Sequence, residues 1–457
     1  PVFALVYLVA ADTPVRRRIV QLLAAGLAVV VSAGWWVAAV ALTPASARPY
    51  VGGSQTNSIL ELTLGYNGFG RLTGNETGSV GGGPGRGWGP TGWTRMFGGE
   101  VGGQIAWLLP AALIALVVGL WATRRAPRTD RYRAALLLWG GWLVVTGLIF
   151  SFMQGIFHAY YTVALAPAVG AVVGIGASRL WQLRDRLWAD TVLAVGCATT
   201  AVWSYVLLGR SASWHPWLRV MILAVGLGAA VLLVLAARLA RPMAAAAAGL
   251  ALVAALAGPL AYALNTAASA HAGAIPSAGP RVAGTGFGGG PGGGTAPGGR
   301  GGTAPGGGRG APPGGGRGAV PVGGRGAVPG GGRGGGGGGL LGAATPSTGL
   351  TTLLTADAGS YTWIAAAVGA NNAAGYQLAT GDPVLAVGGF NGSDPSPTLA
   401  QFQRYVADGK IHYFIGGSGF GLRANGGSST SQEIAAWVAQ NFTATTVSGI
   451  PVYDLVR

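Results

Sequence analysis

Seven apolar runs constrain this chain more strongly than any other feature of its sequence. A helix needs about 20 apolar residues to cross a bilayer, and most of the runs are close to that length. They lie near residues 19–42, 104–122, 134–152, 161–180, 190–208, 217–237 and 243–264. Only 9% of the 457 residues are charged, against about 25% in an ordinary soluble domain. The sequence therefore predicts a multi-pass α-helical membrane region over residues 1–264.

The arginines of the short connections predict how this region is oriented. With Arg16, Arg17 and Arg18 in the cytoplasm, alternation of the spans places 13 arginines inside and two, Arg210 and Arg219, in outer turns. Cytoplasmic loops carry such an excess of Lys and Arg. One lysine against 28 arginines, with heavy use of Ala and Gly, is typical of a GC-rich bacterial genome. We expect a bacterial plasma-membrane protein with the large loop 43–103 and residues 265–457 outside the cytoplasm.

Residues 265–349 are expected to form a linker. Between 281 and 341 the sequence is mostly Gly, Pro and Ala, with an arginine every eight or nine residues. Such a segment cannot bury apolar surface, so disorder is expected. Arg-Gly repeats in a cytosolic protein would suggest RNA binding. Because the predicted topology places them outside the cytoplasm, we expect a flexible tether and no nucleic-acid partner.

Residues 350–457 show the pattern of a small soluble α/β domain with a mostly parallel sheet. Strands are predicted at 351–357, 383–389, 411–417 and 450–455, and helices at 359–373, 397–408 and 430–441. Ligands bind beyond the carboxyl ends of strands in such sheets, where two glycine-rich loops would lie. The candidate ligand residues of these loops are Gly388, Gly389, Asn391, Asp394, Gly416, Gly417 and Ser418. Tight turns that bind nothing are the alternative.

The turn at residues 158–161 concentrates hydrogen-bonding side chains between two predicted spans. It carries His158, Tyr160 and Tyr161. An imidazole and two phenols at a membrane–water interface fit either an aromatic belt or a ligand site. The ligand interpretation gains weight because no other short loop carries so many hydrogen-bonding side chains.

Carboxylates and cysteine are scarce on the predicted outer side. Glu61, Glu76 and Glu100 are the carboxylates of the membrane region there. Each could be a catalytic base or a metal ligand, but a solvated loop acid is the simpler interpretation because no diagnostic spacing pairs them. The single cysteine, Cys197, lies inside an apolar run, so neither a disulfide framework nor a metal cluster is expected.

The membrane region resembles glycosyltransferase family 39, a GT-C family of multi-spanning enzymes that use lipid-linked sugars. The matching stretches are YNGFGRLTG at 66–74 and HAYYTVALAPA at 158–168, the latter followed by a Gly/Ala-rich helix. This family includes dolichyl-phosphate-mannose protein mannosyltransferases and the aminoarabinose transferase. The tail resembles the C-terminal domain of YkcA/YkcB-type mannosyltransferases through residues 377–399 and 409–415.

The resemblance implies an enzyme that takes a sugar, such as mannose, from a polyprenyl-phosphate donor in the lipid bilayer. The acceptor would be an extracytoplasmic glycan or protein. The family's catalytic aspartate lies in the first outer loop. This chain opens with Pro1 inside an apolar run and is expected to be a truncated fragment that begins after that aspartate. The catalytic residue is therefore unknown and the fragment is expected to be inactive, while a divalent metal in the intact parent is left open.

The same resemblance suggests roles for residues on the outer side. A phosphate at the edge of a membrane needs donors that neutralise its charge. Donor-phosphate binding is expected from the turn and from one loop arginine, namely His158, Tyr160, Tyr161 and Arg71. Tyr66 and Asn67 would bind sugar hydroxyls.

Two other classes of protein stay open. A transporter or flippase of lipid-linked precursors would carry charged residues within its spans or helices broken at mid-membrane. The acids and arginines of the predicted spans lie at their ends, which disfavours ion-coupled transport. A membrane-anchored cell-surface binding module is the third possibility, although seven spans are more than an anchor needs.

Overall fold

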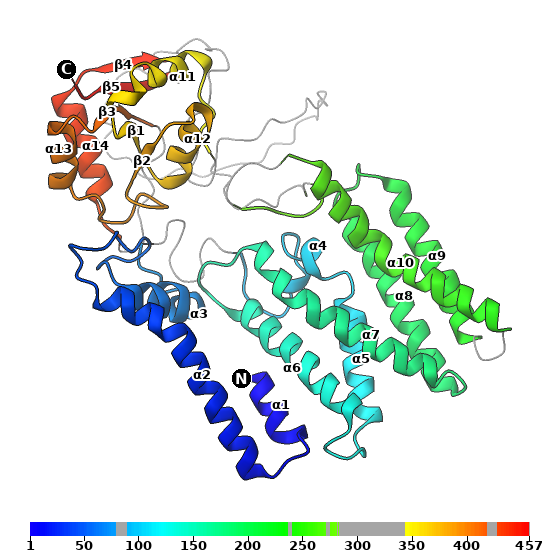
Figure 1. Cartoon of the computed structure of the whole chain (residues 1–457). Helices are drawn as coiled ribbons and strands as arrows, with labels where there is room; N and C mark the ends of the chain where they lie inside the picture. Colours follow the sequence, from blue (N-terminus) through cyan, green and yellow to red (C-terminus); the bar gives the residue numbers. More distant parts are fainter. Residues whose placement is uncertain are drawn as a thin grey trace, which may run out of the picture.

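The computed structural model describes residues 1–78, 89–235, 240–270, 275–280, 282, 343–417 and 427–456. Within these residues, six helical segments are long and apolar enough to cross a membrane. They are α2 (Val15–Leu42), α6 (Arg131–Phe152), η3 (Ala159–Leu165) with α7 (Ala166–Gln182), α8 (Leu187–Gly209), α9 (Pro216–Val234) and α10 (Arg241–Ala268). A multi-pass helical region followed by a small α/β domain is therefore confirmed (Figure 1).

The predicted span at 104–122 is not one long helix. It folds as α4 (Gly102–Ile105) and α5 (Leu109–Ala122). Pro110 lies in the first turn of α5, where its missing N–H and its ring prevent α4 from continuing through this position. The 14 residues of α5 extend about 21 Å, which is less than the ~30 Å hydrocarbon core.

The long helices present apolar side chains to their surroundings. In α2, whose residues are all described, the one buried side chain is Arg18. Its Nε donates a hydrogen bond of 2.6 Å to the carbonyl oxygen of Thr13. Val29 and Trp35 of the same helix and Leu252 of α10 are exposed. A helix on the surface of a soluble protein buries one apolar stripe, so apolar residues around the helix fit a lipid environment.

The arginine-rich turns and the C-terminal domain lie at opposite ends of the helices (Figure 1). The connections at 11–14, 123–130 and 183–186 lie at the lower end of the view, while the C-terminal domain lies at the upper end, beside the loop that follows α2. The first helix, α1 (Val2–Ala10), packs beside α6. Which end faces the cytoplasm stays a prediction.

The loop after α2 contains short helical segments that carry residues of the candidate site. These are η1 (Glu61–Phe69), α3 (Gly70–Thr73) and η2 (Arg95–Phe97). η1 has π-helical hydrogen bonding. This type of hydrogen bonding is rare in proteins as a whole, but where it occurs it is often at a functional site. At the other end of the membrane region, α10 continues to Ala268, and most of the predicted linker 265–349 lies outside the described residues.

The C-terminal domain is built on a sheet with the strand order β2-β1-β3-β5-β4. Its strands are β1 (Trp363–Val368), β2 (Val384–Val387), β3 (Ile411–Ile415), β4 (Ala444–Val447) and β5 (Ile450–Asp454). β1 pairs in parallel with β2 and β3, whereas β5 runs antiparallel to β3 and β4. The predicted parallel sheet is thus extended by an antiparallel hairpin.

Helices cover both faces of this sheet. They are α11 (Thr348–Thr355), α12 (Ala370–Thr380), α13 (Leu399–Ala407) and α14 (Thr430–Asn441), and the short turn η5 (Ala358–Ser360) precedes β1. Leu350 and Tyr376, from α11 and α12, belong to one apolar cluster. Phe402 and Ile434, from α13 and α14, belong to another that contains the alternate residues of β1. The predicted strands at 383–389, 411–417 and 450–455 and the helices at 397–408 and 430–441 are confirmed, with shorter bounds for most.

Two predictions at the start of the domain are wrong. Residues 351–357, predicted as a strand, belong mostly to helix α11, because the Ser347 side chain caps its first turn and Leu350 and Leu354 bury one face. Residues 359–373, predicted as a helix, contain β1. Its alanines favour helix by intrinsic propensity, but β1 lies inside a parallel sheet that is covered on both faces, where small buried side chains let the helices approach.

Candidate functional site

The site begins where the loop after α2 pairs with the turn before η3. The backbone N–H groups of Gln154 and Gly155 donate to the carbonyl oxygens of Leu72 (3.2 Å) and Arg71 (3.0 Å). A Cβ on Gly155 would lie 2.6 Å from Glu76 Oε1 and 2.7 Å from Arg71 Cα. Only glycine therefore lets the two segments approach, and this contact brings Arg71 beside the turn at 158–161.

Glu76 holds the two segments together. It is only 1% exposed, and its carboxylate accepts the N–H of Ile156 at 2.9 Å from both oxygens. Its Oε1 also lies 3.0 Å from Arg71 Nη1. Burial raises the pKa of Glu76, and Arg71 and the Ile156 N–H oppose the rise. The simpler interpretation of Glu76 as a solvated loop acid is therefore wrong, and the carboxylate positions both Arg71 and the turn.

The side chains of the turn form an aromatic cluster. His158 stacks on Tyr160 with ring centroids 5.4 Å apart, and Tyr161 meets both rings edge to face. Phe157 is 1% exposed and packs under Tyr161. Arg95 lies 4.3 Å from the centre of the Phe157 ring. The rings are thus fixed by packing, while Tyr160 remains exposed at the surface.

Arg71 connects this cluster to the residues expected to bind sugar. Its guanidinium lies 4.8 Å from the centre of the Tyr66 ring and donates from Nη2 to Asn67 Oδ1 at 3.1 Å. A guanidinium has five N–H donors, so Arg71 can hold Glu76 and Asn67 and still present donors to a ligand. Its side chain is 18% exposed, so a ligand can reach it.

The C-terminal domain contacts the same loop through residues that follow β2. Asp394 is 4% exposed and accepts the N–H of Gly53 at 2.8 Å. The Ser393 hydroxyl donates to the carbonyl oxygen of Gly78 at 2.6 Å, and the N–H of Ser428 donates to Gln55 Oε1 at 3.1 Å. Burial raises the pKa of Asp394, and the Gly53 N–H opposes the rise. The domain is therefore attached where the loop shapes the site.

These contacts enclose a polar cavity of about 320 Å³. Its lining joins the loop, the turn and the C-terminal domain, and its polar side chains are Tyr66, Arg71, His158, Tyr160, Tyr161, Asn391, Ser393 and Asp394. A second cavity, of about 610 Å³, has a largely apolar wall that includes Leu64, Ile149 and Met153. Arg71 and Tyr161 line both cavities. The polar cavity and the apolar cavity therefore meet at these two side chains.

Most of the predicted site residues come together here. Arg71, Tyr66, His158, Tyr160 and Tyr161 line the polar cavity, as do Asn391 and Asp394 from a loop more than 200 residues away. Asn67 lines the apolar cavity instead. The loop with Asn391 and Asp394 was predicted to follow the carboxyl end of a strand, and it does follow β2. Its ligand role stays a prediction.

The glycines of the two predicted loops do not line the cavity. Gly388 and Gly389 have φ angles of +77° and +66°, so they form the tight turn that was the alternative to a ligand role. Gly416 follows the last residue of β3 and donates its N–H to the carbonyl oxygen of Pro451 in β5. Neither Gly416 nor Gly417 lines the polar cavity. Ser418 lies outside the described residues.

The contacts of two further site residues were not predicted from the sequence, although Glu76 was a candidate catalytic base or metal ligand. Glu76 and Ser393 carry no motif, and their importance comes from tertiary contacts with segments far along the chain. The loop that contains Ser393 was predicted to be a ligand loop or a tight turn, with Asn391 and Asp394 but not Ser393 among its candidate ligands. Among the described residues, no group of three or more His, Cys, Asp or Glu side chains could hold a metal ion.

The pKa of His158 is lowered to about 4, because burial penalises the charged imidazolium and because Arg71 lies near. This value lies below the ~6.5 of an unfolded histidine. The contribution of His158 to stability is therefore complete above about pH 6.5 and is lost as the pH falls toward 4. We expect the difference in thermal midpoint between the wild type and His158→Gln to decrease as the pH falls from about 6.5 to about 4. Above about pH 6.5 this difference should be constant.

The subtraction removes the effects of Glu76 and Asp394, which are present in both proteins. Thermal unfolding of the two proteins in the same detergent between pH 4 and pH 8 measures the difference. A difference that grows as the pH falls would contradict the assignment of a buried neutral imidazole.

The comparisons with known proteins agree with this architecture. Residues 350–441 match the family described as "Putative mannosyltransferase YkcB-like, C-terminal". Over 96% of its length the chain is 25% identical to "Putative mannosyltransferase YycA" and 26% identical to "Putative mannosyltransferase YkcB", both of Bacillus subtilis (strain 168). The chain resembles the YkcB-type proteins. The resemblance predicted from residues 377–399 and 409–415 is confirmed.

The similarity to the YkcB-type proteins covers part of their length. The chain spans 67% of YycA and 66% of YkcB. No solved structure matches the chain. The site therefore has to be interpreted from its own geometry.

Proposed function

We propose that this chain binds a polyprenyl-phosphate sugar and that the protein transfers the sugar, outside the cytoplasm, to a glycan or protein acceptor. The observation that carries the proposal is the meeting of a polar and an apolar cavity at Arg71 and Tyr161. A lipid-linked sugar has the same division, with a phosphate between a hydrocarbon chain and a polyhydroxyl group. The names of the similar proteins support a glycosyltransferase-like function.

Each part of the donor has a matching surface. The prenyl chain fits the apolar cavity beside Leu64 and Ile149. The phosphate fits between the guanidinium of Arg71 and the hydroxyl of Tyr161, because charge-assisted hydrogen bonds to phosphate are the strong ones. The sugar extends into the polar cavity toward Tyr66 and Asn391, which line it.

We assign two roles to the residues of this chain, namely binding of the donor and stabilisation of the phosphate as it departs. The side chains that face the phosphate donate hydrogen bonds, as a departing phosphate requires. Asn391, Ser393 and Asp394 of the C-terminal domain form one wall of the polar cavity. An acceptor that reaches the sugar therefore meets this domain, which gives it a role in acceptor choice.

Transfer by membranes that contain the protein tests the proposal. The protein is expected to transfer label from one member of a panel of polyprenyl-phosphate sugars. We expect Tyr161→Phe to slow the reaction roughly 10²–10³-fold, the range typical of losing one such donor. The variant keeps the ring and its packing, so an aromatic-belt role would leave transfer unchanged.

The membranes must contain equal amounts of the two proteins, as judged by immunoblot. Tyr205→Phe is the matched control, because Tyr205 lies on α8 and lines neither cavity of the site. No transfer above that of membranes lacking the protein, with any donor of the panel, would overturn the proposal. Normal transfer by Tyr161→Phe would remove the turn from the site.

A further inference from the structure

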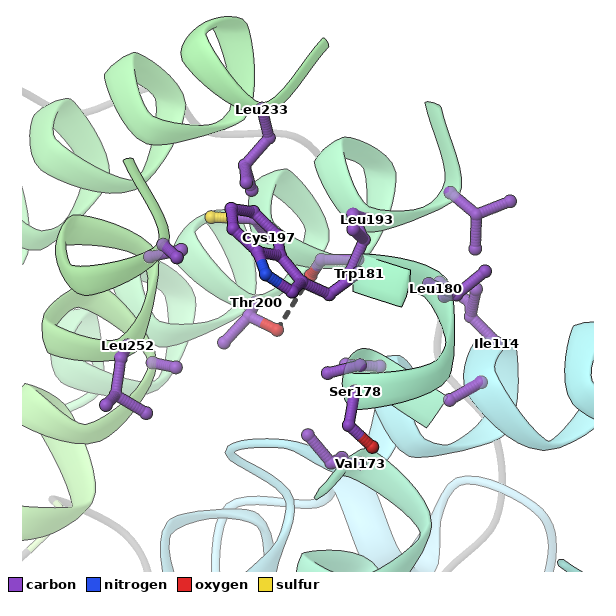
Figure 2. A pocket seen from close by; sticks show the side chains of 18 of the residues that line it. Ile114, Val173, Ser178, Leu180, Trp181, Leu193, Cys197, Thr200, Leu233 and Leu252 are labelled. Carbon is purple, nitrogen blue, oxygen red and sulfur yellow. Dashed lines mark hydrogen bonds between the residues drawn. The ribbon is translucent and has the colours of Figure 1, made fainter. Parts of the chain in front are cut away.

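A separate cavity of about 490 Å³ lies between α5, α7, α8, α9 and α10, away from the site described above. Figure 2 shows side chains that line it, with Trp181 among Leu193, Cys197 and Leu233. Its wall is formed almost entirely by aliphatic side chains. The volume lies within the range of ligand pockets, about 300–1,000 Å³.

Three polar side chains of this wall already have partners in the backbone, and a fourth, Gln182, accepts a hydrogen bond from Arg179. Thr200 donates to the carbonyl oxygen of Gly196 at 2.8 Å, as the dashed line in Figure 2 shows. Cys197 Sγ donates to the carbonyl oxygen of Gly226 at 3.3 Å, and the Ser178 hydroxyl donates to that of Ile175 at 3.1 Å. The cavity therefore presents mostly hydrocarbon, which suits a hydrocarbon chain as its occupant.

An arginine-lined cavity of about 310 Å³ adjoins the apolar one. Arg124, Arg179 and Arg186 line it, and Ala115 and Leu180 line both cavities. It lies at the end of the helices opposite the C-terminal domain, where the positive-inside rule predicts the cytoplasm.

One acid near this arginine-lined cavity, Asp190 in the first turn of α8, is buried. In the described parts of the chain, none of the three arginines forms an ion pair. The carboxylate of nearby Asp130 caps α6 by accepting the N–H of Arg133 at 2.7 Å. The aromatic residues Tyr132 and Trp121 complete the wall, and such residues are common at membrane interfaces.

We propose that the two cavities together bind an anionic phospholipid, with its phosphate on the arginines and one acyl chain in the apolar cavity. Along α8, the apolar lining runs from Val192 to Thr200, about 9 to 21 Å from Arg186 at 1.5 Å per residue. One leaflet of the hydrocarbon core is about 15 Å deep, so an acyl chain attached to a headgroup at the arginines reaches into the apolar cavity. Basic pockets between membrane helices bind anionic headgroups in this way.

The test is retention of lipid by the purified full chain, measured by native mass spectrometry after exchange into mixed phosphatidylglycerol and phosphatidylcholine. We expect preferential retention of phosphatidylglycerol. The double variant Arg179→Gln/Arg186→Gln should lose it about tenfold. Arg125→Gln, which changes an arginine outside both cavities, should retain it.

A second pair of variants tests the acyl chain. A Cβ added at Gly196 meets nothing within 4 Å, and Gly196 lines the apolar cavity. Gly196→Leu should therefore fill the cavity and reduce retention about tenfold. Gly228→Leu, at another helical glycine with open space that lines neither cavity, is the control.

Three outcomes would overturn the proposal. Equal retention of the two lipids would mean that the arginines select no headgroup. Unchanged retention in Gly196→Leu would mean that the apolar cavity is a packing gap. Displacement of phosphatidylglycerol by equimolar polyprenyl phosphate would assign the site to a different lipid.

Discussion

Arg71→Ala should reduce sugar transfer at least as much as any other single change in the polar cavity. Arg71 is the charged donor at the point where the two cavities meet. Removing one preorganised donor to a developing negative charge typically costs about 2.7–4 kcal/mol, or roughly 10²–10³ in rate. The affinity for the donor should fall as well, by about ten- to a hundredfold, because a hydrogen bond to a charged group contributes about 1.5–3 kcal/mol.

The Arg71 experiment needs a control for the buried carboxylate that the arginine neutralises. Arg71→Ala leaves Glu76 without its counter-ion, which would itself disturb the turn. The double variant Arg71→Gln/Glu76→Gln removes both charges and keeps side chains of similar size. If the double variant binds and transfers normally, the arginine has only a structural role. If both variants fail at equal thermal stability, Arg71 acts on the donor.

Glu76→Ala should both destabilise the protein and abolish donor binding. The carboxylate holds the Ile156 N–H and Arg71 while only 1% exposed. Breaking a buried ion pair by removing one partner costs about 3–5 kcal/mol. Because the Arg71 side chain is 18% exposed, water compensates part of this loss, and we expect a value at or below the lower end. Thermal unfolding and binding of polyprenyl phosphate are the two measurements.

Glu61→Ala is the matched control for Glu76→Ala. Glu61 belongs to the same loop and accepts the N–H groups of Gln55 and Thr56 near the surface, and it lines neither cavity of the site. Its removal should lower the thermal midpoint less and leave binding intact. A Glu76→Ala protein with wild-type stability would show that the carboxylate does not hold the loop and the turn together.

The sequence was sufficient to predict elements that depend on local composition. Long apolar runs determine membrane helices because the bilayer leaves backbone groups no other partner. The turn at 158–161 could be singled out because its polar side chains stand between two such runs. Arg71 was predicted to bind the donor phosphate because residues 66–74 resemble a family motif. The structure places Arg71 beside the turn, in the wall of the same cavity.

Features that depend on distant contacts could not be predicted in this way. Glu76 becomes buried only because Gly155 allows the loop to approach the turn. The loop with Asn391 and Asp394 was predicted to follow a strand, but nothing in its residues indicated that it would meet Gly53. The error at 359–373 has the same origin, since burial in the sheet overrides the helix propensity of alanine.

Photocrosslinking of a lipid donor to the protein tests the central claim most directly. A polyprenyl phosphate with a photoreactive group on the prenyl unit nearest the phosphate would be bound to the purified chain, irradiated and mapped by peptide mass spectrometry. We expect crosslinks within residues 64–72 and 149–161, which line the two cavities at Arg71 and Tyr161, and competition by unlabelled polyprenyl phosphate. Crosslinks confined to α8, α9 and α10, or insensitive to the competitor, would contradict donor binding at this site.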